Sequence, residues 1–129
     1  SQEKMIKIIK TDKAPASTSP VSQGTKGAGM VFIGGQMPRD MTTGKIVEGA
    51  VNQARLSLEH CITILREAGS DVEDVLLAVV YMTDLSQKDA VNLVFLEVFG
   101  DMPPTRNLVE VSDIGEGTIV EIALTAIAH

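Results

Sequence analysis

The chain has 129 residues, of which 44% are hydrophobic, and its 11 basic and 17 acidic side chains give a formal net charge of -6. This length fits one domain, residues 1–129, and leaves too little chain for a second core of ordinary size. The apolar content, together with only 22% charged residues, excludes a disordered chain.

The same arithmetic argues against a membrane or a nucleic acid as a partner. The longest uninterrupted apolar run, Val75–Met82, is far shorter than the roughly 20 residues that a membrane-spanning helix needs. Affinity for nucleic acid comes mostly from Lys and Arg that neutralise phosphates, whereas this chain is acidic. With no Trp, one Tyr and three Phe, it also offers few aromatic platforms for stacking bases.

Cys61 is the one cysteine of the chain. An intrachain disulfide therefore cannot form and a thiolate metal cage lacks ligands, which favours a reducing compartment. No charged-then-apolar leader opens the sequence, so we expect a cytoplasmic protein. Cys61 itself is predicted to be a small buried hydrophobe.

The first third of the chain reads as short strands. Residues Met5–Ile9 are β-prone, and residues 12–20 are rich in Pro, Ser, Thr and Ala, as is typical of an extended loop. Val21–Lys26 and Met30–Ile33 flank the glycine-containing turn 27–29, which predicts a hairpin.

The Gly34-Gly35 pair is predicted to interrupt the second hairpin strand, and from about Glu48 the period of the apolar residues changes. They now recur at intervals of three and four, which predicts one helical stripe, formed by Val51, Ala54, Leu58, Cys61, Ile62, Leu65 and Ala68. Gly69 is well placed to end this helix in a left-handed cap.

The apolar, β-branched run Val75–Met82 is typical of a strand covered on both faces. Ser86, with Asp89 three residues later, resembles a capping box and predicts the start of a second helix. That helix should stop at the breakers that follow, Gly100, Pro103 and Pro104. Two strands are predicted to close the chain, at Thr105–Val111 and Thr118–Ala128.

The last of these strands is largely apolar on both faces. Alternation assigns one face to Val120, Ile122, Leu124 and Ala126. It assigns the other face to Ile119, Glu121, Ala123, Thr125 and Ile127. Two helices can cover only one face of a sheet of about six strands, so a second copy of the chain is the most economical cover for the other face. We therefore predict an α+β two-layer sandwich that assembles into a closed homo-oligomer.

Familiar catalytic constellations are mostly missing. Of the two histidines, His129 is the last residue and His60 is predicted to lie on the surface of the first helix. No His, Asp or Glu spacing suggests a metal site. The glycines at 24, 27 and 29 are not followed by a predicted helix, so they do not form a dinucleotide fingerprint. We expect neither a metal nor an organic cofactor.

Two charged residues stand in unusual places. Arg106 follows two prolines at a strand start, where its planar fork could grip a carboxylate; the alternative is a pair with a surface acid. Glu121 lies in mid-strand among apolar neighbours, where a carboxylate rarely stands without a partner. Its alternatives are a structural ion pair or an exposed position.

Six segments, taken in order along the chain, resemble the RidA family, also called the YjgF/YER057c/UK114 family. They are Ala14-Pro15, Ser19–Gln23, Val31–Pro38, Gln53-Ala54-Arg55, Pro104-Thr105-Arg106 and Val120-Glu121-Ile122. The resemblance implies a chorismate-mutase-like sandwich of about six strands with two helices on one face, assembled as a homotrimer with clefts between subunits. It implies hydrolysis of reactive 2-imino or 2-enamino acids to 2-oxo acids and ammonia, as by a 2-iminobutanoate/2-iminopropanoate deaminase, without a cofactor.

Carried over residue by residue, the resemblance implies that Arg106 binds the substrate carboxylate and that Glu121 positions or activates water. Gly35 falls in the main-chain lining of the pocket, and the backbone around Leu108 falls at the carboxylate site.

Four positions depart from the family pattern. Val21 and Gly34 stand where the family commonly has Tyr and Ser, and Asn107 and Leu108 replace a small residue and Cys. Arg106, which the resemblance assigns to the substrate carboxylate, is thus retained, while residues expected to line the cleft differ from the family pattern. This leaves two alternatives to the deaminase, a non-catalytic small-carboxylate-binding or protein-stabilising module, and an endoribonuclease or translation inhibitor, against which the acidic charge argues.

Overall fold

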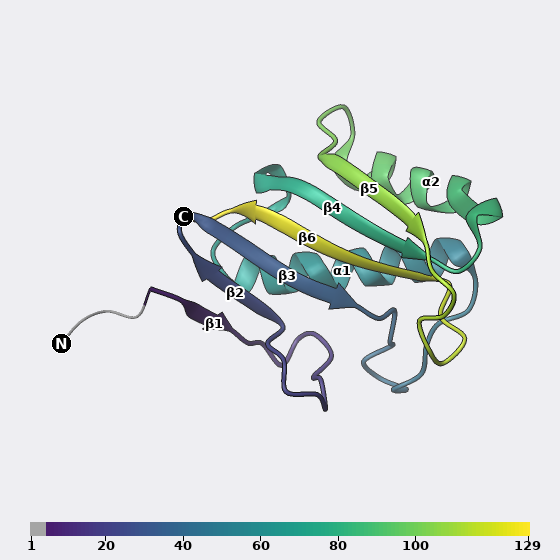
Figure 1. Cartoon of the computed structure of the whole chain (residues 1–129), viewed down its shortest axis with the longest axis horizontal. Coiled ribbons are helices and arrows are strands. Elements are labelled where there is room, and N and C mark those ends of the chain that lie inside the picture. Colours follow the sequence, from purple (N-terminus) through teal and green to yellow (C-terminus); the bar gives the residue numbers. More distant parts are fainter. Residues whose placement is uncertain (1–4) are drawn as a thin grey trace.

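The protein is a six-stranded sheet with two helices packed on one face, as the computed structural model shows for residues 5–129 (Figure 1). The strands are β1 Lys7–Ile9, β2 Gly24–Gly27, β3 Met30–Gln36, β4 Val75–Met82, β5 Thr105–Glu110 and β6 Val120–Ile127. The helices are α1 Ala50–Glu67 and α2 Lys88–Phe99, with short 3-10 turns η1 Val72–Asp74 and η2 Leu85–Gln87. The predicted α+β two-layer sandwich is confirmed.

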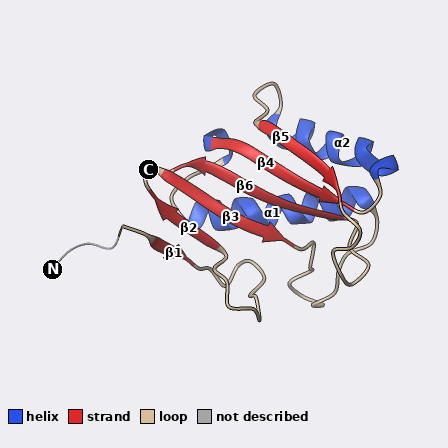
Figure 2. Cartoon of the chain, in the orientation of Figure 1, coloured by secondary structure: helices blue, strands red, loops and turns tan. Residues whose placement is uncertain are grey.

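The last strand in the sequence lies near the middle of the sheet. The strand order is β1-β2-β3-β6-β4-β5, and β4 pairs with β5 in parallel while the other pairs are antiparallel. The parallel pair needs a crossover, and α2 supplies it on the same side of the sheet as α1 (Figure 2). β6 is therefore held between β3 and β4 and faces α1.

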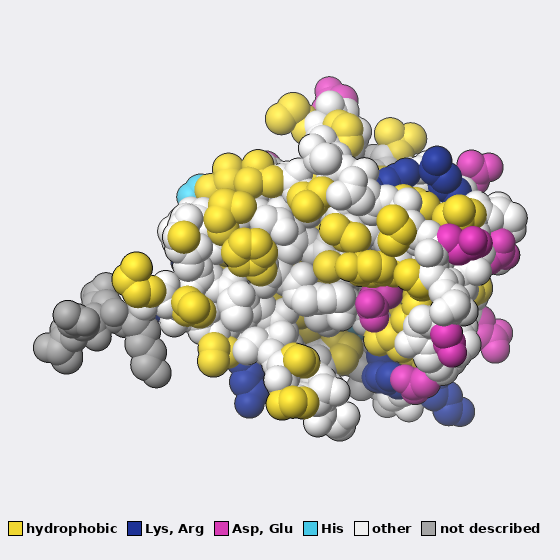
Figure 3. Space-filling view, in the orientation of Figure 1, with side chains coloured by type: hydrophobic (Ala, Val, Ile, Leu, Met, Phe, Trp, Pro, Cys, Tyr) yellow, Lys and Arg dark blue, Asp and Glu magenta, His cyan; other side chains and the backbone are white. Residues whose placement is uncertain are grey.

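The two faces of β6 differ as alternation predicts. On the helix side, four apolar side chains are at most 2% exposed, namely Val120, Ile122, Leu124 and Ala126. Among residues 5–129, no helix or strand covers the opposite side, and large apolar side chains remain exposed there, among them Phe32 and Val109. Figure 3 shows this open face, with hydrophobic side chains gathered over the strands.

The hairpin and the glycine pair differ in detail from the predictions. Gly27 belongs to β2 and pairs with Met30, so the turn is the two-residue Ala28-Gly29, both with positive φ, as a tight hairpin turn requires. The Gly34-Gly35 pair does not interrupt β3; the strand continues to Gln36, with a register shift against β6. The glycines thus mark a bulge instead of a strand end.

The first helix begins and ends near its predicted limits. It starts at Ala50, two residues after Glu48, and Gly69 has φ +90° just beyond the C-cap residue Ala68, as predicted.

The capping box predicted for the second helix is wrong. The Asp84 carboxylate accepts hydrogen bonds from both the amide and the hydroxyl of Ser86. Asp84 therefore begins η2, and α2 follows only at Lys88. Asp84, two residues upstream, therefore serves as the N-terminal cap that the sequence pattern assigned to Ser86.

Polar side chains of α1 reach across the core to the backbone of the sheet. Ser57, which is fully buried, donates its hydroxyl to the Gln36 carbonyl at 2.7 Å and accepts the Ile122 amide at 2.9 Å. These groups belong to β3 and β6 at the bulge, where the regular ladder is broken. One hydroxyl thus satisfies two backbone groups that would otherwise be buried without partners.

The neighbouring turns of α1 repeat this arrangement. Gln53 Oε1 accepts two successive backbone amides where β6 begins, those of Ile119 and Val120. Cys61 is fully buried, as predicted, with Sγ 3.1 Å from the Ile122 carbonyl oxygen, and burial raises the pKa of its thiol. The surface position predicted for His60 is wrong: its ring is buried, with Nε2 2.7 Å from the Arg39 carbonyl oxygen.

Ser57→Ala should lower the free energy of unfolding by about 2–3 kcal/mol, because it leaves the Gln36 carbonyl and the Ile122 amide unsatisfied. Chemical denaturation measures this. Thr63→Ala is the matched control on the same helix, since the Thr63 hydroxyl bonds only the Glu59 carbonyl at the surface; we expect a change within about 0.5 kcal/mol. Equal effects of the two substitutions would contradict the role of Ser57.

Candidate functional site

Glu121 lies on the open face of β6 and is half-buried. Its strand neighbours Val120 and Ile122 point into the core, so alternation sends its side chain to the other side. Burial raises the pKa of its carboxyl group. Within residues 5–129 no side chain or amide donates a hydrogen bond to this carboxylate or forms an ion pair with it, so the structural ion pair considered from the sequence is not present there.

Gly35 lies directly against this carboxylate. A Cβ atom at position 35 would stand 2.7 Å from Glu121 Oε2, closer than non-bonded atoms approach. At Gly34 the same atom would meet only carbonyl oxygens at 3.5 and 3.6 Å, an ordinary contact distance. Gly35 is therefore required by the position of Glu121, while Gly34 is not.

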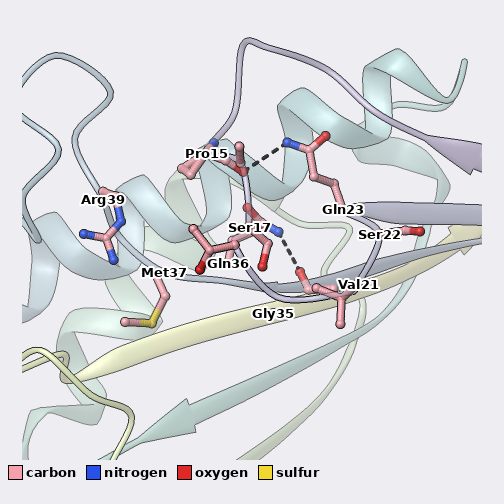
Figure 4. A pocket seen from close by; sticks show the side chains of 12 residues that line it. Pro15, Ser17, Val21, Ser22, Gln23, Gly35, Gln36, Met37 and Arg39 are labelled. Atoms are coloured by element: carbon pink, nitrogen blue, oxygen red, sulfur yellow. Dashed lines mark hydrogen bonds between the residues drawn. The ribbon is translucent and has the colours of Figure 1, made fainter.

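A cavity of about 480 Å³ opens beside Gly35, between the end of β3 and the loop 15–23 (Figure 4). Three residues predicted for the cleft line it, namely Val21, Gly34 and Gly35. Met37 and Arg39 line it as well, from the segment that follows β3. Glu121 itself borders a smaller hollow of about 220 Å³ with Tyr81 and Asp113.

The Gln23 side chain holds the loop that forms one wall of the larger cavity. Its Oε1 accepts the Thr11 amide at 2.7 Å, and its Nε2 donates to the carbonyl oxygens of Thr11 at 3.0 Å, Ala14 at 3.3 Å and Pro15 at 3.0 Å. We did not predict this role from the sequence. The one available signal was a lone amide side chain after a stretch rich in Pro and Ser.

The loops that flank Glu121 and the cavity are joined by an ion pair. The Arg39 guanidinium donates to both carboxylate oxygens of Glu116 and, at 2.8 Å, to the Gly44 carbonyl. The Arg39 partner holds the pKa of the Glu116 carboxyl below its ordinary value. Glu116 has φ +55° and stands between two glycines that also have positive φ, Gly115 and Gly117. The pair thus fixes a turn that a non-glycine residue rarely adopts.

Arg106 lies on the other face of the sheet, at its edge. It pairs with Ala78 of β4, whose side chain is fully buried under the helices, so Arg106 points to the helix side. Its Nη2 donates to Asn92 Oδ1 at 2.8 Å, and its guanidinium carbon lies 4.9 Å from the centre of the Phe95 ring. Leu108 points to the same side, and Asn107 to the open face.

The charge of Arg106 is not neutralised by a carboxylate. The other three arginines of the described chain each pair with an acid, Arg39 with Glu116, Arg55 with Glu97 and Arg66 with Asp71. Arg106 has an amide and an aromatic ring instead. The alternative of a surface ion pair therefore does not hold among residues 5–129.

One chain does not bring the two predicted catalytic residues together. Arg106 stands on the edge strand on the helix side, and Glu121 stands on the open face two strands away. Val21, Gly34 and Gly35 gather at the Glu121 side, and the Leu108 backbone stays with Arg106. The predicted site residues of one chain therefore fall into two groups on opposite faces of the sheet, which we call half-sites.

Residues 5–129 hold no cluster of three or more His, Cys, Asp or Glu side chains placed to bind a metal ion. In the same part of the chain, neither helix is long and apolar enough to span a bilayer.

Comparison with known proteins gives one consistent result. The family model described as Endoribonuclease L-PSP matches residues 11–128. A RutC family protein of Pyrococcus horikoshii is 38% identical over 123 residues, which covers 95% of this chain and 98% of that protein. A 2-iminobutanoate/2-iminopropanoate deaminase of Salmonella typhimurium is 35% identical over 126 residues, with the same coverage. The crystal structure of Escherichia coli TdcF with bound serine superposes with a TM-score of 0.90 at 36% identity, covering 95% of this chain and 99% of that one.

Glu121→Gln should stabilise the protein at neutral pH and not in acid. Because the pKa of Glu121 is raised in the folded state, the wild-type protein keeps its full stability below the ordinary carboxyl pKa and loses part of it as the pH rises through the folded-state value. Urea denaturation at pH 4 and pH 7.5 measures the difference. Glu59→Gln, at an exposed position of α1, is the control; a Glu121→Gln gain that is the same at both pH values would contradict the prediction.

Gly35→Ala should displace the Glu121 carboxylate, because the new methyl group would stand 2.7 Å from Oε2; since this flexible side chain can move aside, stability should change by less than about 1 kcal/mol. Gly34→Ala, its matched control, should change stability by less than about 0.5 kcal/mol. Neither glycine has a positive φ, so backbone strain does not distinguish them. Carbon-13 NMR of the Glu121 carboxyl group should show a shifted resonance only in Gly35→Ala; an unshifted resonance would disprove the contact.

Proposed function

Since the chain belongs to the Endoribonuclease L-PSP family, which is the RidA (YjgF/YER057c/UK114) family, we propose that it hydrolyses reactive 2-imino and 2-enamino acids to 2-oxo acids and ammonia. The single observation that carries the proposal is the free fork of Arg106. Among the arginines of residues 5–129, Arg106 is the one without a carboxylate partner, and Asn92 and Phe95 hold its guanidinium in place. A small 2-imino acid supplies the missing carboxylate.

The site forms between subunits of a homotrimer in this proposal. Arg106 and the backbone around Leu108 come from one protomer, and Gly35 and Glu121 come from its neighbour. Two features support this arrangement. The two half-sites face opposite sides of one sheet, and the open face exposes apolar side chains that a second copy would bury.

The reaction requires the protein mainly to orient the imine and the attacking water molecule. Water adds to C2 of the imine, its oxygen bonding to carbon, while Glu121 relays a proton from that water to the nitrogen. The resulting carbinolamine then gives its hydroxyl proton to the nitrogen through the same carboxylate. The C2–N bond breaks, and ammonia and the 2-oxo acid leave. The raised pKa of Glu121 brings its proton affinity closer to that needed for such a relay at neutral pH.

Two relatives support the substrate class. The Salmonella protein is named for the deamination of 2-iminobutanoate and 2-iminopropanoate. The TdcF structure holds serine, a small molecule with the same carboxylate next to a nitrogen-bearing carbon.

An assay with an amino-acid oxidase that produces imines tests the proposal. The protein should speed release of the 2-oxo acid, and Arg106→Ala should reduce that increment by at least about a hundredfold, because it removes a bidentate, charge-assisted anchor. Arg55→Ala, which removes an arginine paired with Glu97 between the helices, should leave the increment in place. Carboxylate binding by calorimetry without turnover of any imine would favour the non-catalytic binding module instead.

Mixed assembly tests the shared site. Arg106→Ala and Glu121→Gln chains, each inactive alone, are unfolded together in equal amounts and refolded. Random assembly should restore about a quarter of wild-type activity, because that fraction of the clefts then combines an intact Arg106 with an intact Glu121. No recovery in properly assembled oligomers would place both residues in one chain's site.

A further inference from the structure

The volume and the lining of the cavity beside Gly35 indicate which substrate side chains the site can accommodate. We propose that the site prefers 2-imino acids with branched or aromatic apolar side chains over 2-iminopropanoate. The inference rests on the proposed function and names the substrate class of that same site.

The cavity is far larger than a small imino acid requires. Its volume of about 480 Å³ falls within the roughly 300–1,000 Å³ of pockets that hold drug-sized ligands, whereas 2-iminopropanoate has about six non-hydrogen atoms. The cavity adjoins Gly35, which touches the Glu121 carboxylate. A substrate held with its C2 atom near Glu121 therefore extends its side chain into this space.

Hydrogen bonds hold both walls of the cavity in place. The Gln23 side chain makes four hydrogen bonds to the backbone of residues 11–15, and Figure 4 shows the one that it donates to Pro15. On the far side, Arg39 is fixed by Glu116 and Gly44. A preformed pocket binds a large side chain without an ordering cost.

The amide N–H donors and the cation of the cavity lining already have partners, while the hydroxyls of Thr18 and Ser22, which also line it, are neutral. The Gln36 side-chain amide donates to the Gly34 carbonyl at 3.1 Å, and the Gln23 side-chain amide donates to backbone carbonyls of residues 11–15. Arg39, the cation of this lining, is neutralised by Glu116. The lining therefore offers no uncompensated charge to an acidic or basic substrate side chain.

Four apolar residues of the lining are available to contact a substrate side chain. Pro15, Ala16, Val21 and Met37 line the cavity. Val21 is 67% exposed, so it is a short side chain at a position where a larger one could stand. Figure 4 shows Val21 and Arg39 at opposite ends of the pocket. The span between them, next to the Met37 thioether, suits a branched aliphatic or aromatic group.

Steady-state kinetics on imines made by an oxidase from leucine, phenylalanine and alanine tests the preference. For the wild-type protein, we expect kcat/KM for the leucine- and phenylalanine-derived imines to exceed that for 2-iminopropanoate by about tenfold or more, as added buried methylenes imply. Val21→Phe should fill the cavity and lower that ratio at least about fivefold. Ile6→Phe is the matched control, since Ile6 is 63% exposed and lines neither this cavity nor the neighbouring hollow; its ratio should equal that of the wild type.

The outcomes separate the two proposals. Turnover of 2-iminopropanoate at least as efficient as that of the bulky imines would overturn the preference and leave the proposed function standing. A wild-type preference that Val21→Phe does not reduce would also overturn the inference, because the side chain would then bind elsewhere, for example in space shaped by the neighbouring protomer. No turnover of any imine would overturn both.

Discussion

The contact on which the rest of the structure depends is the bridge that Ser57 makes from α1 to the sheet. Its hydroxyl joins the Gln36 carbonyl of β3 to the Ile122 amide of β6 at the point where the β3–β6 ladder loses its register. Without such a donor and acceptor, a bulge here would bury two unsatisfied backbone groups. The bulge in turn sets Gly35 against Glu121. A helix hydroxyl in the core thus determines where the carboxylate of the candidate site lies.

Glu121 and Arg106, the two charged residues of the candidate site, both lack an opposite charge within the described chain. Burial disfavours the ionised form of Glu121, and the Arg106 guanidinium contacts the Asn92 amide and the Phe95 ring instead of a carboxylate. Structures rarely keep such groups for stability, because pairing or replacing them would cost less. Their opposite signs and opposite faces fit a cleft in which one protomer supplies the anchor and the next supplies the carboxylate. A ligand with one carboxylate then completes the charge balance at Arg106.

The sequence predicted best where periodicity is long. The spacing of Val51 to Ala68 located α1, and alternation in the last strand separated its buried face from its open one. It failed where several local acceptors compete, as Asp84 did with Ser86, and where tertiary contact overrides exposure, as for His60 under the loop at Arg39. The bulge at Gly34-Gly35 and the loop anchor at Gln23 depend on partners distant in the sequence, which single-chain patterns do not reveal.

Local patterns of apolar, glycine and charged residues were sufficient to predict the fold class, the family resemblance and the two residues of greatest chemical interest. Three-dimensional contacts were needed to show that Arg106 and Glu121 face opposite sides of the sheet, that a side chain at Gly35 but not at Gly34 would meet the Glu121 carboxylate, and that Arg39 of the cavity lining is paired with Glu116. These properties arise from strand order and register. They bring together residues from β3, β6 and the loop at 15–23, whose separation along the chain hides their contact.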